Sequence, residues 1–181
     1  KKIEENEANS IKLNKTLKSY NLSMDDLMDD HKDAKEDLTA SKKEVEAYEK
    51  LYKEYGCKET DTILDCMDVP YADGLTRPVT SGKVTSECGL RLHPTLHYYR
   101  MHEGIDISVP TGTKVYASAA GIVSKITRVA NPNKANSSCG GNIVRIQHLI
   151  DGERYTTVYM HLLSINVSLG DVVTSNSVIG Y

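Results

Sequence analysis

Two short segments of this sequence carry side chains that could support hydrolytic chemistry. His102 and Asp106 lie four positions apart in a His-Glu-Gly-Ile-Asp segment, and imidazole nitrogens and carboxylate oxygens are both common zinc ligands. His161 follows in a Tyr-Met-His-Leu segment, where it could act on a metal-bound water. Catalytic zinc usually has three protein ligands, and the sequence offers no convincing third.

The His102–Asp106 pair requires a bend in the chain. On a flat strand the two residues would lie about 13 Å apart, whereas zinc ligands bind ~2.0–2.2 Å from a shared ion. Gly104 lies midway between them and could allow a bulge or kink. A His-x-x-x-Asp spacing is weak evidence for a metal site when it is taken alone.

The composition excludes some classes of function. The chain has 181 residues and a formal net charge of −3, without the basic stripe that nucleic-acid binding needs. No apolar run approaches the ~20 residues of a transmembrane helix. The chain opens on Lys1-Lys2-Ile3 without a signal-peptide core, so that, if the protein is exported, we expect this chain to be a mature or internal piece of it.

Four cysteines, at positions 57, 66, 88 and 139, contain no Cys-x-x-Cys pair, which argues against a structural zinc knuckle. Cys57 and Cys66 flank a short polar loop and could close it as a disulfide. Four cysteines allow three pairings, and sequence does not choose among them. We favour an oxidising compartment over four free cytosolic thiols.

Residues 1–56 form a charged arm with helical periodicity. Apolar residues recur three and four positions apart, interrupted by His31 and Ser41, and Gly56 is a plausible helix stop. The arm is either one helix or two, because Ser23 and Asp26 resemble a fresh helix start. Its seam would need a second helix, a dimer partner or upstream sequence, unless the arm is a solvated spacer. The seam residues are Leu13, Leu17, Tyr20, Met24, Leu27, His31, Ala34, Leu38, Ser41, Val45, Tyr48, Tyr52 and Tyr55.

The remaining chain divides into a linker, residues 57–79, and a β-rich region, residues 80–181. The linker contains Pro70, Pro78 and an Ala-Asp-Gly turn signal. After it, short apolar runs are broken by Gly and Pro, and the Asp151-Gly152 pair between two β-like runs predicts a hairpin. We expect an all-β domain, either a sandwich or a rolled sheet.

In the second run of that hairpin, alternation divides the side chains between two faces. The more apolar set should face the core and consists of Thr156, Val158, Met160 and Leu162. The other set contains Tyr155, Tyr159 and His161 and should face a solvent groove. In the first run, His148 alternates with apolar residues, which predicts a packed histidine.

A series of motifs over about residues 78–181 resembles the lysostaphin-type zinc endopeptidases, which cut peptidoglycan peptides. The order and spacing of these motifs are highly specific to that family, and the charged arm resembles the coiled-coil region of many exported bacterial members. The motifs are Cys88-Gly-Leu-Arg-Leu-His-Pro94, His102 to Ala117, Gly121-Ile-Val123, Gly141-Asn142, Tyr159-Met-His-Leu162, Gly170-Asp-Val-Val173 and Ile179-Gly180.

The resemblance implies specific roles. His102 and Asp106 match the first two zinc ligands, and His161 matches the histidine that assists the bound water or the developing oxyanion. We expect the groove for an extended substrate peptide to include Tyr159, Asn142 and Arg91. The family's third ligand comes from a later His-x-His strand that this sequence lacks, so we expect a C-terminally truncated, inactive piece with an incomplete site.

The expected function is therefore zinc-dependent hydrolysis of peptidoglycan peptides outside the cell or in the cell wall. Some relatives have instead lost zinc and activate a separate cell-wall amidase as binding modules. The ligand positions are usually replaced in those relatives, so retention of His102, Asp106 and His161 favours the enzyme. His31, His97 and His93 are not expected to take part, although His93 has a minor chance of lining the groove.

Overall fold

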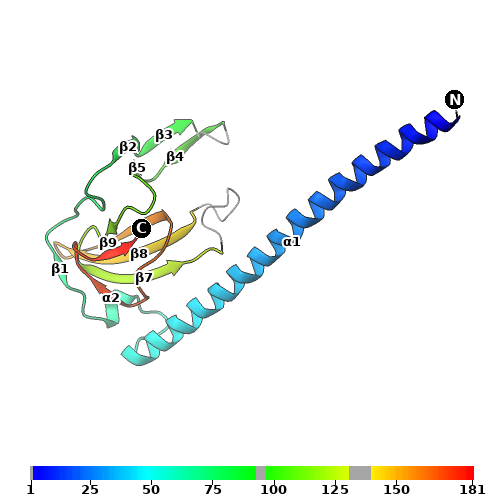
Figure 1. Ribbon diagram of the computed structural model, residues 1–181. Coiled ribbons are helices and arrows are strands. Elements are labelled where there is room, and N and C mark those ends of the chain that lie inside the picture. The colour runs from blue at the N-terminus through cyan, green and yellow to red at the C-terminus, as the bar shows by residue number, and fades with distance from the viewer. Residues whose placement is uncertain (1, 93–96, 131–139) are drawn as a thin grey trace.

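The chain folds as one long helix followed by a β-rich domain (Figure 1). The computed structural model describes residues 2–92, 97–130 and 140–181. After residue 67 the described chain contains strands and loops only, so the predicted fold class, a helical arm ahead of an all-β domain, is confirmed. His93 and Cys139 lie outside the described residues.

The arm is a single continuous helix, α1 (Lys2–Tyr55). A second start at Ser23 does not occur, because the Ser23 hydroxyl donates to the Ser19 carbonyl oxygen four residues back (3.1 Å) rather than to a helix N-terminus. Gly56 has a φ of 66°, the left-handed conformation that favours glycine. The predicted helix stop at Gly56 is confirmed.

The region predicted as a linker is structured. It contains a short helix, α2 (Ile63–Cys66), a disulfide between Cys57 and Cys66 and a strand, β1 (Tyr71–Ala72). Arg154 binds the first turn of α2, with its Nη2 atom 2.6 Å from Asp65 Oδ1. Hydrogen bonds, chiefly from Arg154, hold the pKa of Asp65 below its usual range.

A five-stranded sheet forms the centre of the domain. β8 pairs with β9 on one side and with β7 and β1 on the other, and β10 pairs with β7. Asp151 and Gly152 join β8 to β9 with φ angles of 51° and 81°, which a type I′ hairpin turn requires; the predicted hairpin is confirmed. The strands are β7 (Gly121–Thr127), β8 (Asn142–Ile150), β9 (Glu153–Leu162) and β10 (Val172–Val173).

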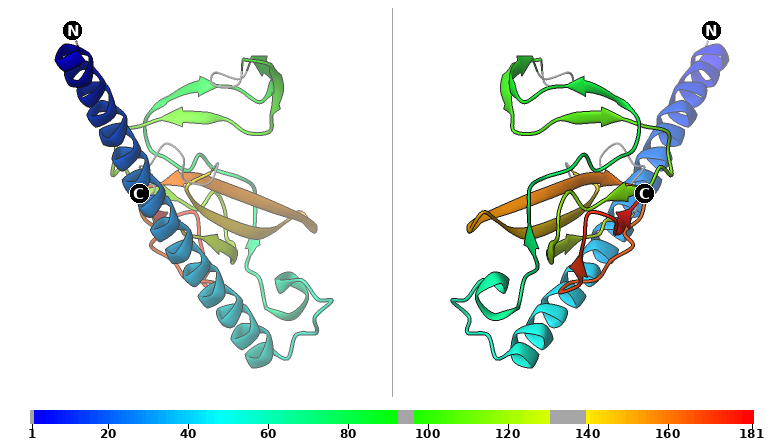
Figure 2. Two further views of the ribbon diagram at one scale, coloured as in Figure 1. Left: turned by 90° about the vertical axis from the view of Figure 1, so that its right-hand side faces the viewer. Right: turned by 90° about the vertical axis from the view of Figure 1, so that its left-hand side faces the viewer.

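Three two-stranded sheets complete the domain: β2–β5, β3–β4 and β6–β11. The first two lie together on one side of the five-stranded sheet, away from the C-terminal half of α1 (Figure 2). Their strands are β2 (Lys83–Ser86), β3 (Gly89–Leu92), β4 (Tyr99–His102) and β5 (Asp106–Ser108), and the third sheet contains β6 (Val115–Tyr116) and β11 (Val178–Gly180).

The main core lies against one face of β8. Its side chains alternate strictly between buried and half-buried, as expected for a strand with one covered face. Val144 and Ile146 are fully buried and pack with residues of β7, β9 and β11. His148 on the same face is also fully buried, so the prediction that it is packed is confirmed.

The arm contacts the domain through its C-terminal part. Leu51 packs against a second core cluster that contains Ile122, and Asp37 Oδ1 accepts a hydrogen bond from the Ala130 amide (2.8 Å). Leu51 approaches Gly170 so closely that a Cβ there would lie 2.7 Å from Leu51 Cδ1. Within the described residues, no helix is both long and apolar enough to cross a membrane.

Candidate metal site

The structure brings His102 and Asp106 together. β4 ends at His102 and β5 begins at Asp106, and because these strands belong to different sheets, the chain bends between them around Gly104. The Nε2 atom of His102 lies 3.3 Å from Asp106 Oδ1. Two ligands that each bind a tetrahedral ion at ~2.0–2.1 Å lie about 3.3–3.4 Å apart, so this pair has suitable spacing for one zinc.

The second ring nitrogen of His102 fixes the protonation of the first. Nδ1 lies 3.0 Å from the Glu87 carbonyl oxygen, which can only accept, so Nδ1 carries the hydrogen. In the neutral ring, Nε2 then presents a lone pair to the Asp106 carboxylate. Two acceptors facing each other favour a cation between them, and a backbone carbonyl on the other nitrogen is typical of metal-bound histidine.

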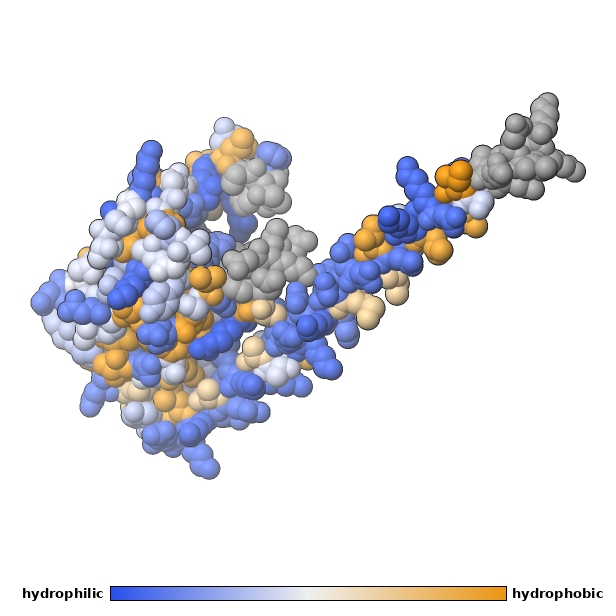
Figure 3. Space-filling model, in the orientation of Figure 1, coloured by the Kyte–Doolittle hydropathy of each residue, from blue (hydrophilic) through white to orange (hydrophobic). Residues whose placement is uncertain are grey.

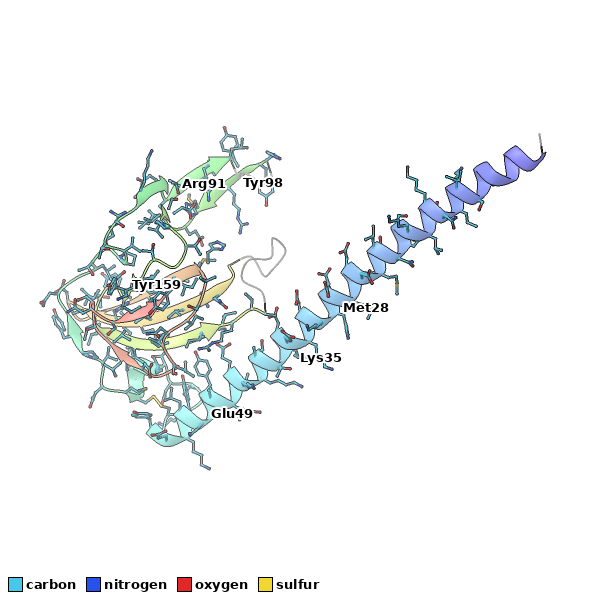
Figure 4. The ribbon with its side chains drawn as sticks, in the orientation of Figure 1. Met28, Lys35, Glu49, Arg91, Tyr98 and Tyr159 are labelled. Atoms are coloured by element: carbon cyan, nitrogen blue, oxygen red, sulfur yellow. A yellow bond between two sulfur atoms is a disulfide. The ribbon has the colours of Figure 1, made fainter. Side chains whose placement is uncertain are left out.

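Arg91 borders the same pair. Its Nη2 atom lies 3.4 Å from Asp106 Oδ2, on the carboxylate oxygen that does not face His102. Its Nε atom is buried without a hydrogen-bond partner among the described residues. Arg91 therefore lies beside Asp106 and helps to orient it, on the β3–β4 hairpin (Figure 4).

His161 lies at a β-bulge near the end of β9. The register of the β8–β9 pair shifts between Asn142 and Val144, which face Leu162 and Tyr159, so one extra residue is accommodated on β9. His161 adopts a φ of 58° and its side chain is exposed. A bulge changes the direction of the side chains that follow it, and both Tyr159 and Leu162 consequently point into the core.

The predicted faces of β9 are wrong ahead of the bulge, where Val158 and Met160 are 47% and 46% exposed, whereas Leu162 beyond the bulge is buried as predicted. Tyr159 is only 7% exposed and does not line a groove; its hydroxyl oxygen accepts a hydrogen bond from the Ser118 amide (2.7 Å). Figure 4 shows Tyr159 within the sheet.

Asn142 also holds strands together inside the domain. Its side chain is buried, with Oδ1 accepting from the Val129 amide (3.0 Å) and Nδ2 donating to the Leu162 carbonyl oxygen (3.0 Å). These bonds tie β8 to the segments beside it. Asn142, like Tyr159, is therefore buried rather than placed along a substrate groove.

His148 belongs to a buried hydrogen-bonded chain. Its Nδ1 donates to the Ala120 carbonyl oxygen (2.8 Å) and its Nε2 lies 2.7 Å from Thr157 Oγ1. The Thr157 hydroxyl lies 2.9 Å from that of Tyr159. Burial lowers the pKa of His148, partly offset by the bond to Ala120, and the neutral ring uses both nitrogens within the fold.

Among the described residues, no three His, Cys, Asp or Glu side chains converge on a point that could hold a metal. His161 is thus not gathered with His102 and Asp106 into one cluster. Cys88 carries an exposed free thiol, and His97 is exposed with a φ of 54°. The role of Glu87 could not be predicted from the sequence, because a contact through a backbone carbonyl leaves no side-chain signal.

Comparisons with known proteins agree with the geometry. The profile of Peptidase family M23 matches residues 100–181. The DD-carboxypeptidase/endopeptidase Mpg of Neisseria meningitidis is 36% identical over 104 residues, which are 58% of this chain and 21% of that protein. The peptidoglycan DD-endopeptidase ShyA of Vibrio cholerae is 40% identical over 90 residues, 50% of this chain and 18% of that protein.

One similar solved structure is a zinc containing peptidase from Vibrio cholerae, with a TM-score of 0.47 and 27% identity over 60% of this chain and 32% of that one. The chain spans about a fifth of the length of the curated relatives that it matches. The family resemblance found in the sequence is confirmed, since residues 100–181 match the profile of the lysostaphin-type Peptidase family M23.

Proposed function

We propose that the protein is a zinc-dependent endopeptidase that hydrolyses peptide bonds of peptidoglycan, outside the cell or in the cell wall. The observation that carries the proposal is the 3.3 Å approach of His102 Nε2 to Asp106 Oδ1 inside the segment that matches the peptidase family. The peptidoglycan endopeptidases among the relatives support the choice of substrate.

In this proposal His102 and Asp106 hold the zinc. Bound zinc supplies Lewis acidity for peptide hydrolysis. The Glu87 carbonyl keeps the His102 ring in the tautomer that leaves Nε2 free to coordinate. Arg91 holds the outer oxygen of Asp106, so that the carboxylate presents its other oxygen to the metal.

His161 holds or moves a proton at its imidazole in this proposal. Its exposed position at the end of β9 leaves the ring accessible to a substrate. Among the described strands, β9 pairs with β8 alone, so backbone groups on its outer edge are available. An extended peptide could add to that edge by backbone hydrogen bonds.

The second possibility is a binding module that activates a cell-wall amidase. Such a module does not need metal ligands. The paired His102 and Asp106 side chains, supported by Glu87 and Arg91, favour the enzyme.

Variants of the full-length protein test the assigned roles. We expect His102→Ala and Asp106→Ala to lose the metal, since each removes a ligand. We expect His161→Ala to keep its zinc while cleavage of purified peptidoglycan slows by about 10²–10⁴-fold, the usual cost of losing one proton-transfer group. Metal content is measured by atomic emission beside each cleavage rate.

His31→Ala is the matched control, because it removes an exposed histidine from the arm and should change neither readout. Loss of zinc from His161→Ala would overturn the division of roles and make His161 a ligand. Full activity of His102→Ala would overturn the proposed function.

The 181-residue chain itself is expected to bind zinc weakly and to show no measurable hydrolysis. Its described residues provide two of the three ligands that catalytic sites use. Calorimetric titration with zinc and a peptidoglycan assay measure both properties. Sub-micromolar affinity together with turnover would contradict this expectation.

A further inference from the structure

The β3–β4 hairpin has two faces of opposite chemistry. One face carries four apolar side chains, each between 53% and 71% exposed. They form two cross-strand pairs, Leu90 with Met101 and Leu92 with Tyr99. Figure 3 shows apolar residues in the upper part of the domain, where this hairpin lies. Surface hairpins commonly turn the apolar face toward the core and the polar face toward water, so the reversed arrangement indicates a polar contact on the other face.

The second face carries two arginines. Arg91 on β3 lies directly opposite Arg100 on β4, and the neighbouring pair on the same face is Gly89 with His102. Like charges directly opposite each other destabilise a pair of strands. An anion between the two guanidinium groups would remove this repulsion and bind both of them.

This cationic face is turned toward the candidate metal site. Arg91 Nη2 and His102 Nε2 both approach the carboxylate of Asp106, at 3.4 Å and 3.3 Å. Arg100 precedes His102 by two residues on the same face, which is about 7 Å along the strand. An anion held by the two arginines would therefore lie about two residues of extended peptide away from a bond placed at the metal site.

Neither arginine is fully engaged within the fold. The contact of Arg91 with Asp106 is long, since charge-assisted hydrogen bonds of this kind usually measure about 2.7–2.9 Å. Its Nε atom has no hydrogen-bond partner among the described residues. Arg100 is exposed, and no acidic side chain in the described part of the chain forms an ion pair with it. Each guanidinium thus retains N–H donors for a ligand.

We propose that Arg91 and Arg100 form a carboxylate-binding subsite beside the metal site, which makes an acidic peptide the substrate class. A guanidinium donates two parallel N–H groups to a carboxylate, so two guanidinium groups can hold one carboxylate from both sides. The carboxylate belongs either to the C-terminus of the peptide or to a side chain within about two residues of the bond that is cut. The choice of a peptide rests on the proposed function, whereas the choice of an anion rests on the hairpin.

Binding of peptides to the 181-residue chain tests the subsite without requiring hydrolysis. The probes are a synthetic peptidoglycan stem peptide with free carboxylates, the same peptide amidated at its C-terminus, and the same peptide amidated at its side-chain carboxylate. The free acid should bind about tenfold more tightly than at least one of the two amides, as expected for one hydrogen bond to a charged group. The amide that binds weakly identifies the source of the carboxylate. Nuclear magnetic resonance titration of the labelled chain measures each affinity.

Substitution of Arg100 should remove the preference for the acid. In Arg100→Gln the free acid and the amides should bind equally, while the melting temperature stays unchanged or rises slightly, because repulsion from Arg91 is lost. Arg100→Lys should retain part of the preference, since lysine keeps the charge but lacks the planar fork.

Arg128→Gln is the matched control. It removes the same charge from an exposed arginine outside the hairpin, where Arg128 Nη2 lies 3.4 Å from the Val167 carbonyl oxygen, and it should keep the full preference for the acid. A loss of preference in Arg128→Gln as large as that in Arg100→Gln would show attraction by net charge alone and would overturn the subsite.

Two further results with the wild-type chain would overturn it. One is equal binding of the free acid and both amides, and the other is the absence of any binding at peptide concentrations up to about 10 mM.

Failure of the subsite and failure of the proposed function are distinguishable. Cleavage of the acid and both amides at equal rates by the full-length protein would keep the enzyme and exclude the subsite. Binding that depends on the carboxylate and on Arg100, without cleavage by the full-length protein, would keep the subsite and exclude the enzymatic function.

Discussion

The five-stranded sheet and the small sheets beside it differ in how much apolar side-chain surface each buries. Val144 and Ile146 in β8 are fully buried, whereas Leu90 in β3 and Met101 in β4 are 67% and 55% exposed. The candidate metal ligands lie at the ends of β4 and β5, in the sparsely packed layer. Fold stability and candidate chemistry thus depend on different parts of the domain.

Truncation of one aliphatic side chain in each layer is the most direct test of this difference. Ile146→Ala removes a fully buried side chain and should lower the free energy of unfolding by about 2–5 kcal/mol. Leu90→Ala removes a mostly exposed one and should change it by less than about 0.5 kcal/mol. Urea unfolding measures both, and equal losses would show that the layers fold as one core.

Reduction of the Cys57–Cys66 disulfide should have the next largest effect. The bond closes a loop with a sequence separation of 9, which constrains the unfolded chain by about 2–3 kcal/mol in the chain-entropy model. Cys57→Ser with Cys66→Ser should lower the melting temperature to that of the reduced protein. Mass mapping of non-reduced peptides would contradict the bond if both residues were recovered as free thiols.

A pair of glycines offers a finer comparison of the two layers. A Cβ at Gly121 in β7 would lie 2.3 Å from the Gln147 carbonyl oxygen and 2.6 Å from His148 Nδ1, so Gly121→Ala should cost about 1–3 kcal/mol. A Cβ at Gly104 would meet nothing within 4 Å. Gly104→Ala should leave the melting temperature nearly unchanged. A large drop in the melting temperature would show that the backbone between His102 and Asp106 requires a glycine.

The smallest expected effect is a pH dependence that originates in the sheet. Burial holds the pKa of His148 below its usual value. Below about pH 6.5 the imidazole of His148 is therefore protonated in the unfolded chain while it stays neutral in the folded chain. The free energy of unfolding should fall by at most about 1.4 kcal/mol per pH unit as the pH drops from 7 to 5. His148→Asn should be less stable at pH 7, yet its stability should depend less on pH over this range; an unchanged slope would contradict the assignment.

Much of this fold could be predicted from local signals. Gly56 ends α1 and Asp151-Gly152 turns the β8–β9 hairpin because both positions need left-handed backbone, which such residues tolerate. The alternation of His148 with Val144 and Ile146 also predicted its burial correctly, since the irregularities in both pairings of β8 place the extra residue on β7 or β9 and leave the alternation of β8 intact.

The faces of β9 were predicted wrongly ahead of the bulge, because the apolar character of Val158 and Met160 suggested burial although both are nearly half exposed. The bulge at His161 then brings Leu162 to the buried face, and that change of alternation has no sequence signal. Tyr159 appeared suited to a polar groove, but its hydroxyl finds partners inside the core. At the candidate site, the approach of His102 to Asp106 was expected, whereas the contribution of Glu87 depends on backbone placement that only the fold reveals.

The unbroken length of α1 has a mechanical consequence. A helix of 54 residues is about 80 Å long at 1.5 Å per residue, and Leu51, close to its C-terminal end, is packed against the domain beside Gly170. A partner that binds the N-terminal end of α1 would therefore be held at a fixed distance from the β-domain. The helix would act as a rigid spacer and not as a flexible linker.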